Sequence, residues 1–153
     1  MKERLSTAWV SVQSAYQRRA DLIPNLVNVM KGYAEHETST FEAVTEARNK
    51  ATQITIDFEN LTPEKLQEFR AAQGELSQAL GRLLTIQEAY PELKANENFM
   101  DLQQQLEGTE NRLNQARKSY DNLAREYHNQ FPDEPLLLFG GNSSELHTPE
   151  LQF

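Results

Sequence analysis

The sequence of 153 residues has no cysteine, an excess of acidic over basic side chains and no long apolar run. Without cysteine the chain has neither disulfides nor thiolate metal ligands, and its redox compartment stays open. The longest apolar run is Leu136–Phe139, far short of the ~20 residues that a transmembrane helix needs. The net charge is −8, whereas binding to a phosphate backbone requires a basic surface. These absences exclude a disulfide scaffold and argue against a nucleic-acid partner.

The dominant pattern in the sequence is helical periodicity. Apolar residues recur at steps of three and four along most of its length, without the alternation of strands and without an internal repeat. We expect one all-α domain over residues 1–132, an antiparallel up-and-down four-helix bundle with long helices and short connections. An irregular C-terminal tail, residues 133–153, is expected to pack on the bundle or trail from it.

The first two helices are expected to meet at residues 20–24. Helix one covers 3–20 and starts without an N-cap, as a helix continuing from an upstream segment would. Asp21 is a candidate N-cap for helix two (24–56), and Pro24 then falls in its first turn, where a missing N–H is tolerated. A single kinked helix running through Pro24 is the alternative. Short connections between antiparallel helices favour the reversal.

The ends of the other two helices are better marked. Thr62-Pro63 combines an N-cap with a proline at the first helical position, and Pro91 is expected to end helix three one residue earlier. The fourth helix starts at Asn96 or Asn98 and stops before Pro132, which makes it roughly 50 Å long.

Two sets of glycines and one apolar cluster give further predictions about packing. Gly74 and Gly81 lie seven residues apart on one face of helix three, where they would let a neighbouring helix approach closely. Gly32 marks either a close approach or a bend. The apolar cluster Leu136–Phe139 is expected to fold back onto the outside of the bundle, because an exposed cluster would favour aggregation.

Several polar side chains fall on the expected inner faces. An unpaired buried charge is strongly destabilising. We therefore expect Arg19, or Arg48 of helix two, to pair across the bundle with Glu37 or Glu110 and so fix the helix register. The alternative is that these are solvated charges near helix ends. The polar residues on inner faces are Arg19, Glu37, Gln73 and Thr109, with Glu110 and Arg117 beside them.

Two parts of the sequence resemble the LemA family. The first comprises Arg18–Val27, Lys31–Glu37 and Val44–Arg48, and the second is Asn98–Arg112, continued by Arg117, Tyr120, Tyr127 and Phe131-Pro132. The resemblance covers about residues 5–132. It departs from the family in lacking the usual N-terminal transmembrane helix, and the family's Tyr-Asn pairs appear as Tyr120-Asp121 and Tyr127-His128.

The resemblance implies a bacterial helical bundle held at the cell membrane by a single anchor that this chain lacks, with the bundle on the cytoplasmic side. The molecular function of such proteins is not established. A magnetosome-membrane branch of the family suggests membrane organisation rather than catalysis.

No arrangement of catalytic residues can be read from the sequence. The adjacent residues Glu35, His36 and Glu37 point about 100° apart on a helix and do not converge on one ion. The sequence has no recognisable nucleophile triad and no phosphate-binding loop after a strand. We therefore expect no enzymatic activity, no cofactor and no metal.

The expected function is a non-catalytic interaction or scaffold domain with protein partners at a membrane. A ligand-binding or metal-binding bundle with a sensing or enzymatic role is the alternative, and it rests on the polar inner-face residues alone. The candidate structural or interaction motif comprises Arg18, Arg19, Asp21, Pro24, Asn25, Glu37, Arg48, Glu110 and Arg117.

Overall fold

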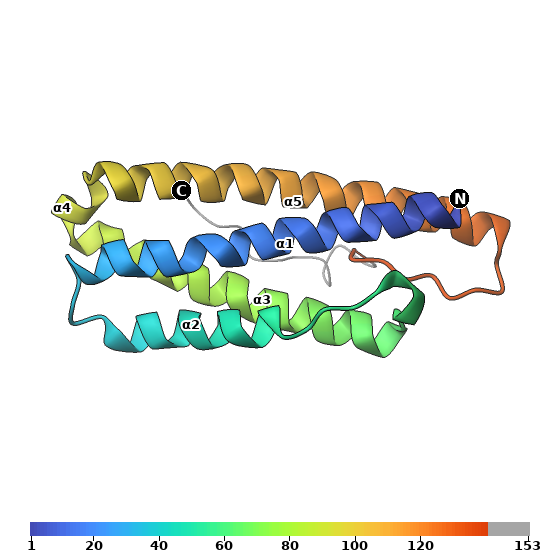
Figure 1. The fold of residues 1–153 in the computed structure, drawn as a ribbon, viewed down its shortest axis with the longest axis horizontal. Coiled ribbons are helices and arrows are strands. Elements are labelled where there is room, and N and C mark those ends of the chain that lie inside the picture. Colours follow the sequence, from blue (N-terminus) through green and yellow to red (C-terminus); the bar gives the residue numbers. More distant parts are fainter. Residues whose placement is uncertain (141–153) are drawn as a thin grey trace.

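Four long helices of alternating direction form the body of the computed structural model, which describes residues 1–140 (Figure 1). They are α1 (Lys2–Lys31), α2 (Thr38–Thr52), α3 (Pro63–Thr85) and α5 (Glu97–Gln130), with the single-turn α4 (Pro91–Lys94) and the 3-10 turns η1 (Phe58–Asn60) and η2 (Ile86–Ala89) between them. The predicted all-α bundle is confirmed, and the described residues contain no strand. Of the predicted tail, residues 141–153 lie outside the described part.

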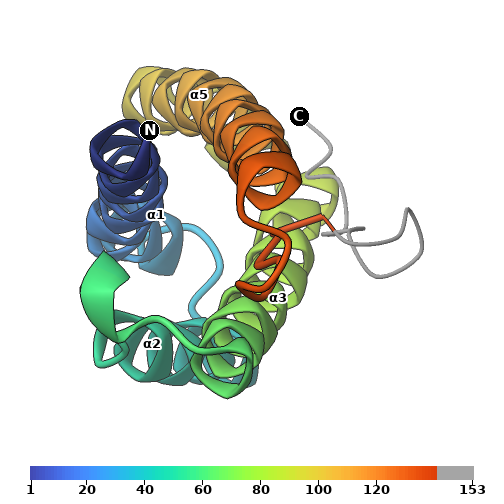
Figure 2. The same cartoon turned by 90° about the vertical axis from the view of Figure 1, so that its right-hand side faces the viewer.

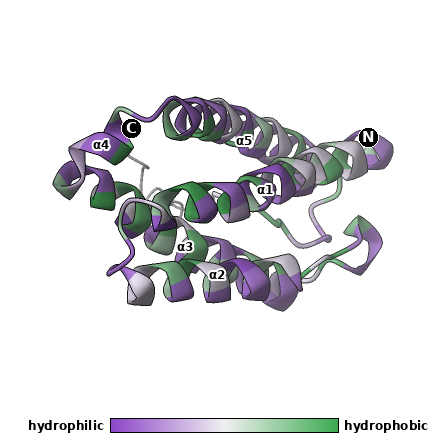
Figure 3. Ribbon diagram, turned by 60° about the vertical axis from the view of Figure 1, so that its left-hand side comes forward, coloured by the Kyte–Doolittle hydropathy of each residue, from purple (hydrophilic) through white to green (hydrophobic). Residues whose placement is uncertain are grey.

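The helices surround a shared apolar interior. Seen end-on, they follow one another around the axis in the order α1, α2, α3, α5 (Figure 2). The closest neighbours are α1 with α5 and α2 with α3. Their apolar faces turn inward and their hydrophilic faces turn outward, as the colouring by hydropathy shows (Figure 3). This inward-facing stripe is the source of most of the helical stability in such a bundle.

The predicted reversal at residues 20–24 is wrong, because α1 continues through Pro24 to Lys31. The alternative of one helix through the proline is correct. Asp21 caps nothing: its exposed carboxylate accepts a hydrogen bond from Gln17 Nε2 at 2.8 Å within α1. A proline inside a helix costs about 3 kcal/mol, but burial of the surrounding apolar side chains holds the helix together. These are Ala20, Leu22, Ile23, Leu26 and Val27.

The actual reversal occupies the residues between Lys31 and Thr38. Gly32 is the C-cap of α1, so it marks the bend. Leu26 and Met30 fall within the range predicted for helix two, but they belong to α1, where both are buried, and Tyr33 is 37% exposed in the turn. Glycine has low helix propensity, so the chain turns where helix formation is least favoured.

The remaining helix ends follow the sequence signals. The Thr62 side chain accepts a hydrogen bond from the Lys65 backbone N–H at 3.2 Å, and α3 tightens into η2 and stops before Pro91. The cap of α5 is Asn96, whose Oδ1 accepts the Phe99 N–H at 2.9 Å. The short helix α4 was not predicted.

Close packing at Gly74 and Gly81 is the second prediction that fails. A Cβ built at either residue meets no atom within 4 Å, so neither glycine is required by a neighbouring helix. Both sit in the interior of α3, where the spacing of seven residues reflects a shared face without an approaching backbone.

The segment after α5 returns to the bundle and inserts one aromatic ring into it. Phe139 is 5% exposed, and its ring centroid lies 5.3 Å from that of Trp9, 5.4 Å from Tyr120 and 6.1 Å from Phe69. These rings come from α1, α5 and α3, so the expected fold-back is confirmed. The expected position on the outside of the bundle is wrong for Phe139, which belongs to the apolar core. Leu136, at the start of that cluster, remains 42% exposed.

The apolar core consists of two clusters rather than one. The cluster nearer the α1–α2 turn includes Leu22, Leu26, Met30, Leu76, Leu80 and Leu106. The cluster nearer the N-terminus includes Trp9, Tyr16, Phe69, Leu113, Tyr120 and Phe139. On α1 and α5 the two clusters are separated by buried polar residues, whereas on α3 the buried Gln73 and Ser77 alternate with Ala72 and Leu76 of the first cluster. We call these polar residues the polar layer: Arg19, Gln73, Ser77, Thr109 and Glu110.

Candidate functional site

Arg19 is the centre of the polar layer and is 0% exposed. Its Nη1 donates to Ser77 Oγ at 2.8 Å and to Glu110 Oε2 at 3.4 Å. Its Nη2 donates to the Gln73 backbone carbonyl and to Gln73 Oε1, each at 3.1 Å. The guanidinium carbon lies 5.2 Å from the centroid of the Tyr16 ring, in cation–π range. One side chain of α1 therefore binds both α3 and α5.

The pairing of Arg19 with Glu110 confirms the predicted ion pair across the bundle. The Glu110 side chain is 12% exposed, so both charges are largely removed from water. Arg19 Nε is buried and has no hydrogen-bond partner among the described residues. Breaking such a pair leaves a charge without compensation, while replacing both partners by apolar side chains is often tolerated. This layer therefore specifies an arrangement of helices more than it adds stability.

Arg48 does not pair with Glu37 or Glu110 as predicted. It makes a different hydrogen bond, whose origin lies in the proline at position 24. In an α-helix the carbonyl of residue 20 accepts the N–H of residue 24, but proline has no N–H. Arg48 Nε of α2 donates to the Ala20 carbonyl at 2.8 Å. A side chain of the next helix thus supplies the donor that Pro24 removes and fastens α2 to α1.

Glu37 and Arg117 take structural positions outside the polar layer. Glu37 precedes α2 instead of lying on an inner face, and its Oε1 accepts the Tyr90 hydroxyl at 3.4 Å. Arg117 Nη1 donates to the Tyr16 hydroxyl at 3.1 Å, and its Nη2 donates to Asn114 Oδ1. The prediction that Glu37 faces the interior of a longer second helix is wrong, because α2 begins only at Thr38.

Arg18, Asp21 and Asn25 form the outward part of the motif. All three are exposed, on successive turns of α1. Positions i, i+3 and i+7 of a helix share a face. We call this surface the α1 stripe. Pro24 is also exposed beside it. The motif therefore has buried members that join helices and exposed members that face solvent.

Sequence reasoning missed Asp121, which holds the returning tail. Asp121 is 7% exposed, and its Oδ1 accepts the Phe139 backbone N–H at 2.8 Å. Burial raises the pKa of this carboxyl above its ordinary value, although backbone hydrogen bonds and the charges of Arg125 and Arg117 oppose the shift. Burial, and then the neighbouring Asp121 charge, also raise the pKa of the Tyr120 hydroxyl. The sequence signal for this contact was an acidic residue directly beside the apolar face of the last helix.

Sequence reasoning also missed how the segment after α2 is held. The Ile56 carbonyl accepts hydrogen bonds from Trp9 Nε1 at 2.7 Å and Gln13 Nε2 at 2.9 Å, and the Ile56 N–H donates to Gln13 Oε1 at 3.1 Å. A buried tryptophan needs a partner for its N–H, and Gln13 lies one turn away on the same face. That spacing was the signal for a polar anchor.

The buried motif residues are therefore bound to one another and do not converge on an open space. Within residues 1–140 there is no group of three or more His, Asp or Glu side chains placed to hold a metal ion. Within the same residues, no helix combines the length and apolar character needed to cross a bilayer.

The Pro24–Arg48 pairing predicts a specific coupling. Arg48→Met is expected to destabilise the protein by about 1–2 kcal/mol, because the Ala20 carbonyl loses its donor. In a Pro24→Ala background, where residue 24 supplies its own N–H, the same change is expected to cost less than half as much. Urea unfolding of the four proteins measures this coupling. Lys50→Met, which removes an exposed ion pair with Glu75, is the matched control on α2. Equal costs in both backgrounds contradict the pairing.

The raised pKa of Asp121 predicts how the stability of the docked tail depends on pH. An acid whose folded-state pKa is raised contributes its full stability below the ordinary pKa and loses it as pH rises through the raised value. Asp121→Asn keeps an acceptor for the Phe139 N–H without this loss. The Tm of Asp121→Asn minus that of the wild type is therefore expected to increase from about pH 4 to pH 7. Asp133→Asn, exposed in the same segment, is the control, and a difference that falls with pH contradicts the assignment.

Comparison with known proteins supplies the family. The description of the matching family is LemA family, and the match covers residues 8–146. A search of curated proteins finds no match. The matched region includes the polar layer, the α1 stripe and the hydrogen bond from Arg48 to the Ala20 carbonyl. The chain belongs to the LemA family.

Proposed function

We propose that this chain is a non-catalytic interaction or scaffold domain, held at a bacterial membrane by an anchor outside these 153 residues. Membership of the LemA family supports the membrane association. The observation that supports the interaction role is that one part of the motif binds neighbouring helices and another part faces solvent. The buried Arg19 and the half-buried Arg48 bind neighbouring helices, while Arg18, Asp21 and Asn25 are exposed.

The α1 stripe has the chemistry of a protein-recognition surface. It presents one cation, one anion and one amide from successive turns of a rigid helix. Gln17 donates to the Asp21 carboxylate and holds it in place. The buried Arg19 and the hydrogen bond from Arg48 to the Ala20 carbonyl belong to the same stretch of α1, so the stripe sits on a part of the helix that is bound to α2, α3 and α5. Such pre-organisation lowers the entropic cost of binding a partner.

Two of the large apolar side chains that are exposed among residues 1–140 support an orientation. Phe131 is 48% exposed and Leu136 is 42% exposed, and the C-terminal end of α5 lies at the same end of the bundle as the N-terminus (Figure 1). An anchor leading into α1 brings this end to the bilayer surface, where aromatic and aliphatic side chains are favourable. The bundle then stands away from the membrane, with the α1 stripe roughly 25–40 Å from its N-terminal end and on the cytoplasmic side.

The alternative is a ligand-binding bundle. It requires an open space lined by suitable side chains, and the polar layer is not such a space because its groups bind one another.

Crosslinking in cells tests the proposed interaction surface. A photo-crosslinking amino acid at Asn25 of the native membrane-held protein is expected to give a discrete covalent adduct with another membrane-associated protein. Arg18→Glu is expected to abolish that adduct without changing Tm, because exposed substitutions alter stability by about 0.5 kcal/mol or less.

The matched control places the photo-crosslinking amino acid at Glu68, which is exposed on α3. Adducts at Glu68 identical to those at Asn25, or no adduct at Asn25, contradict the assignment of the α1 stripe. Recovery of the native gene product in the soluble fraction contradicts the membrane association separately.

A further inference from the structure

A cavity of about 260 Å³ opens on the side of the bundle where α2 ends. Helix α2, which lies between α1 and α3 in the bundle, stops at Thr52, while α1 and α3 extend past this level. The residues that follow, Gln53–Ile56, include Ile54, Thr55 and Ile56, whose branched side chains disfavour helix. An extended segment therefore replaces a helix between α1 and α3 and fills less space, which leaves the cavity.

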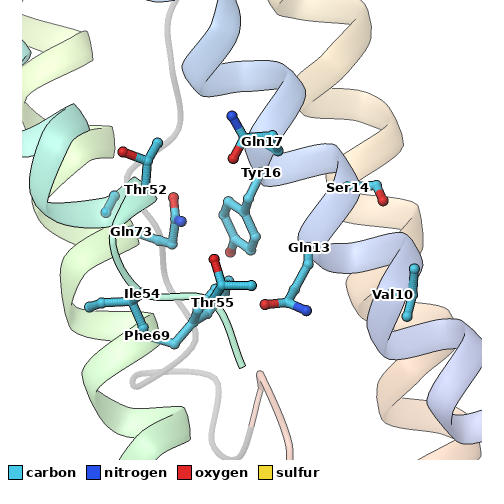
Figure 4. Close-up of a pocket in the computed structure, with 11 residues that line it drawn as sticks. Val10, Gln13, Ser14, Tyr16, Gln17, Thr52, Ile54, Thr55, Phe69 and Gln73 are labelled. Carbon is cyan, nitrogen blue, oxygen red and sulfur yellow. The ribbon is translucent and has the colours of Figure 1, made fainter. Parts of the chain in front are cut away.

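The walls of the cavity come from three elements (Figure 4). Gln13, Ser14, Tyr16 and Gln17 project from α1, while Phe69 and Gln73 project from α3. Thr52 ends α2, and Ile54 and Thr55 belong to the segment after it. The described lining also includes Val10 and Ala51, and none of these residues is charged.

Uncharged hydrogen-bonding groups remain available at the cavity. Gln73 uses Oε1 to accept from Arg19, which leaves its amide N–H groups for another acceptor. Ser14 and Thr55 are exposed, and neither hydroxyl takes part in a hydrogen bond among the described residues. Amides and hydroxyls both donate and accept. The lining thus suits a ligand that carries several hydroxyl or amide groups.

Charge in the ligand is disfavoured at this position. The nearest buried charge, Arg19, is shielded behind Gln73 and opposed by Glu110. An anionic or cationic ligand loses hydration without gaining a counter-charge from the cavity wall. A peptide strand is also disfavoured, because the backbone groups of Ile56 are already bound by Gln13 and Trp9.

We propose that this cavity binds a neutral sugar ring, as a monosaccharide or as one unit of a saccharide. Its volume lies just below the roughly 300–1,000 Å³ of sites for drug-sized ligands, which suits one ring. The C–H faces of a sugar pack against apolar groups, here the exposed Val10 and the half-buried Ile54, while its hydroxyls meet Ser14, Thr55 and Gln73. This inference is independent of the α1 stripe and of the membrane anchor.

Chemical-shift mapping by NMR with the whole chain tests the proposal. N-acetylglucosamine and glucose are the neutral probes, and glucosamine and glucuronate are charged analogues of similar ring shape. We expect saturable shifts of the Thr55 backbone and the Gln73 side-chain amide with a Kd of about 1 mM for at least one neutral probe. Both charged analogues are expected to bind at least about tenfold more weakly.

Two conservative variants distinguish binding at this cavity from nonspecific effects of sugars on the chemical shifts. Ser14→Ala and Thr55→Val each remove one hydroxyl from an exposed position and are expected to weaken binding about two- to tenfold. Ser11→Ala, exposed on the same helix but outside the cavity, is expected to leave the affinity unchanged. Absence of saturable shifts with both neutral probes overturns the proposal, as do equal binding of the charged analogues and identical behaviour of all three variants.

Discussion

The bonds of the Arg19 guanidinium are the interaction on which the rest of this structure depends. A fully buried cation on α1 has to meet acceptors from both α3 and α5 at the same level of the bundle. Apolar side chains tolerate many nearly equivalent packings, whereas a buried charge does not. A shift of any of these three helices by one turn would remove Ser77, Gln73 or Glu110 from reach. The polar layer therefore fixes the register, and on α1 and α5 it lies between the two apolar clusters.

The same stretch of α1 also contains the irregularity that joins α2. Pro24 leaves the Ala20 carbonyl without a helical donor, and Arg48 supplies one. Within one short stretch of α1, Arg19 thus selects the positions of α3 and α5, and Pro24 selects the position of α2. With all three neighbouring helices fixed from within, the outward residues of the stretch are held on a rigid surface. This relation is the physical basis for treating the α1 stripe as an interaction surface.

Much of the fold follows from local sequence signals, because those signals act over a few residues. The caps at Thr62 and Asn96 and the ending before Pro91 needed only the adjacent residues. The caps do not depend on knowing which helices are neighbours. An ion pair across the bundle was also predicted, since a charge on an apolar face requires an opposite charge. The sequence left open whether Arg19 or Arg48 pairs with Glu37 or Glu110, and the structure selects Arg19 and Glu110.

The errors arose where a distant residue decides the outcome. Pro24 reads as a helix boundary unless the donor from Arg48, 28 residues away from Ala20, is known. Asp121 reads as a surface acid unless the returning Phe139 N–H is known. The cavity beside α2 likewise depends on the place where α2 stops and on the partners of Ile56. In each case the missing information is tertiary contact, which no local pattern contains.

The most direct test of the register-fixing role is the unfolding free energy of two variants measured in urea. Arg19→Met removes the cation and leaves Glu110 largely buried, so we expect a loss of about 3–5 kcal/mol. Arg19→Met combined with Glu110→Leu removes both charges, and we expect it to recover most of that loss. If Arg19→Met costs less than about 1 kcal/mol, or if the double variant is no more stable than the single one, the buried pair does not organise this bundle.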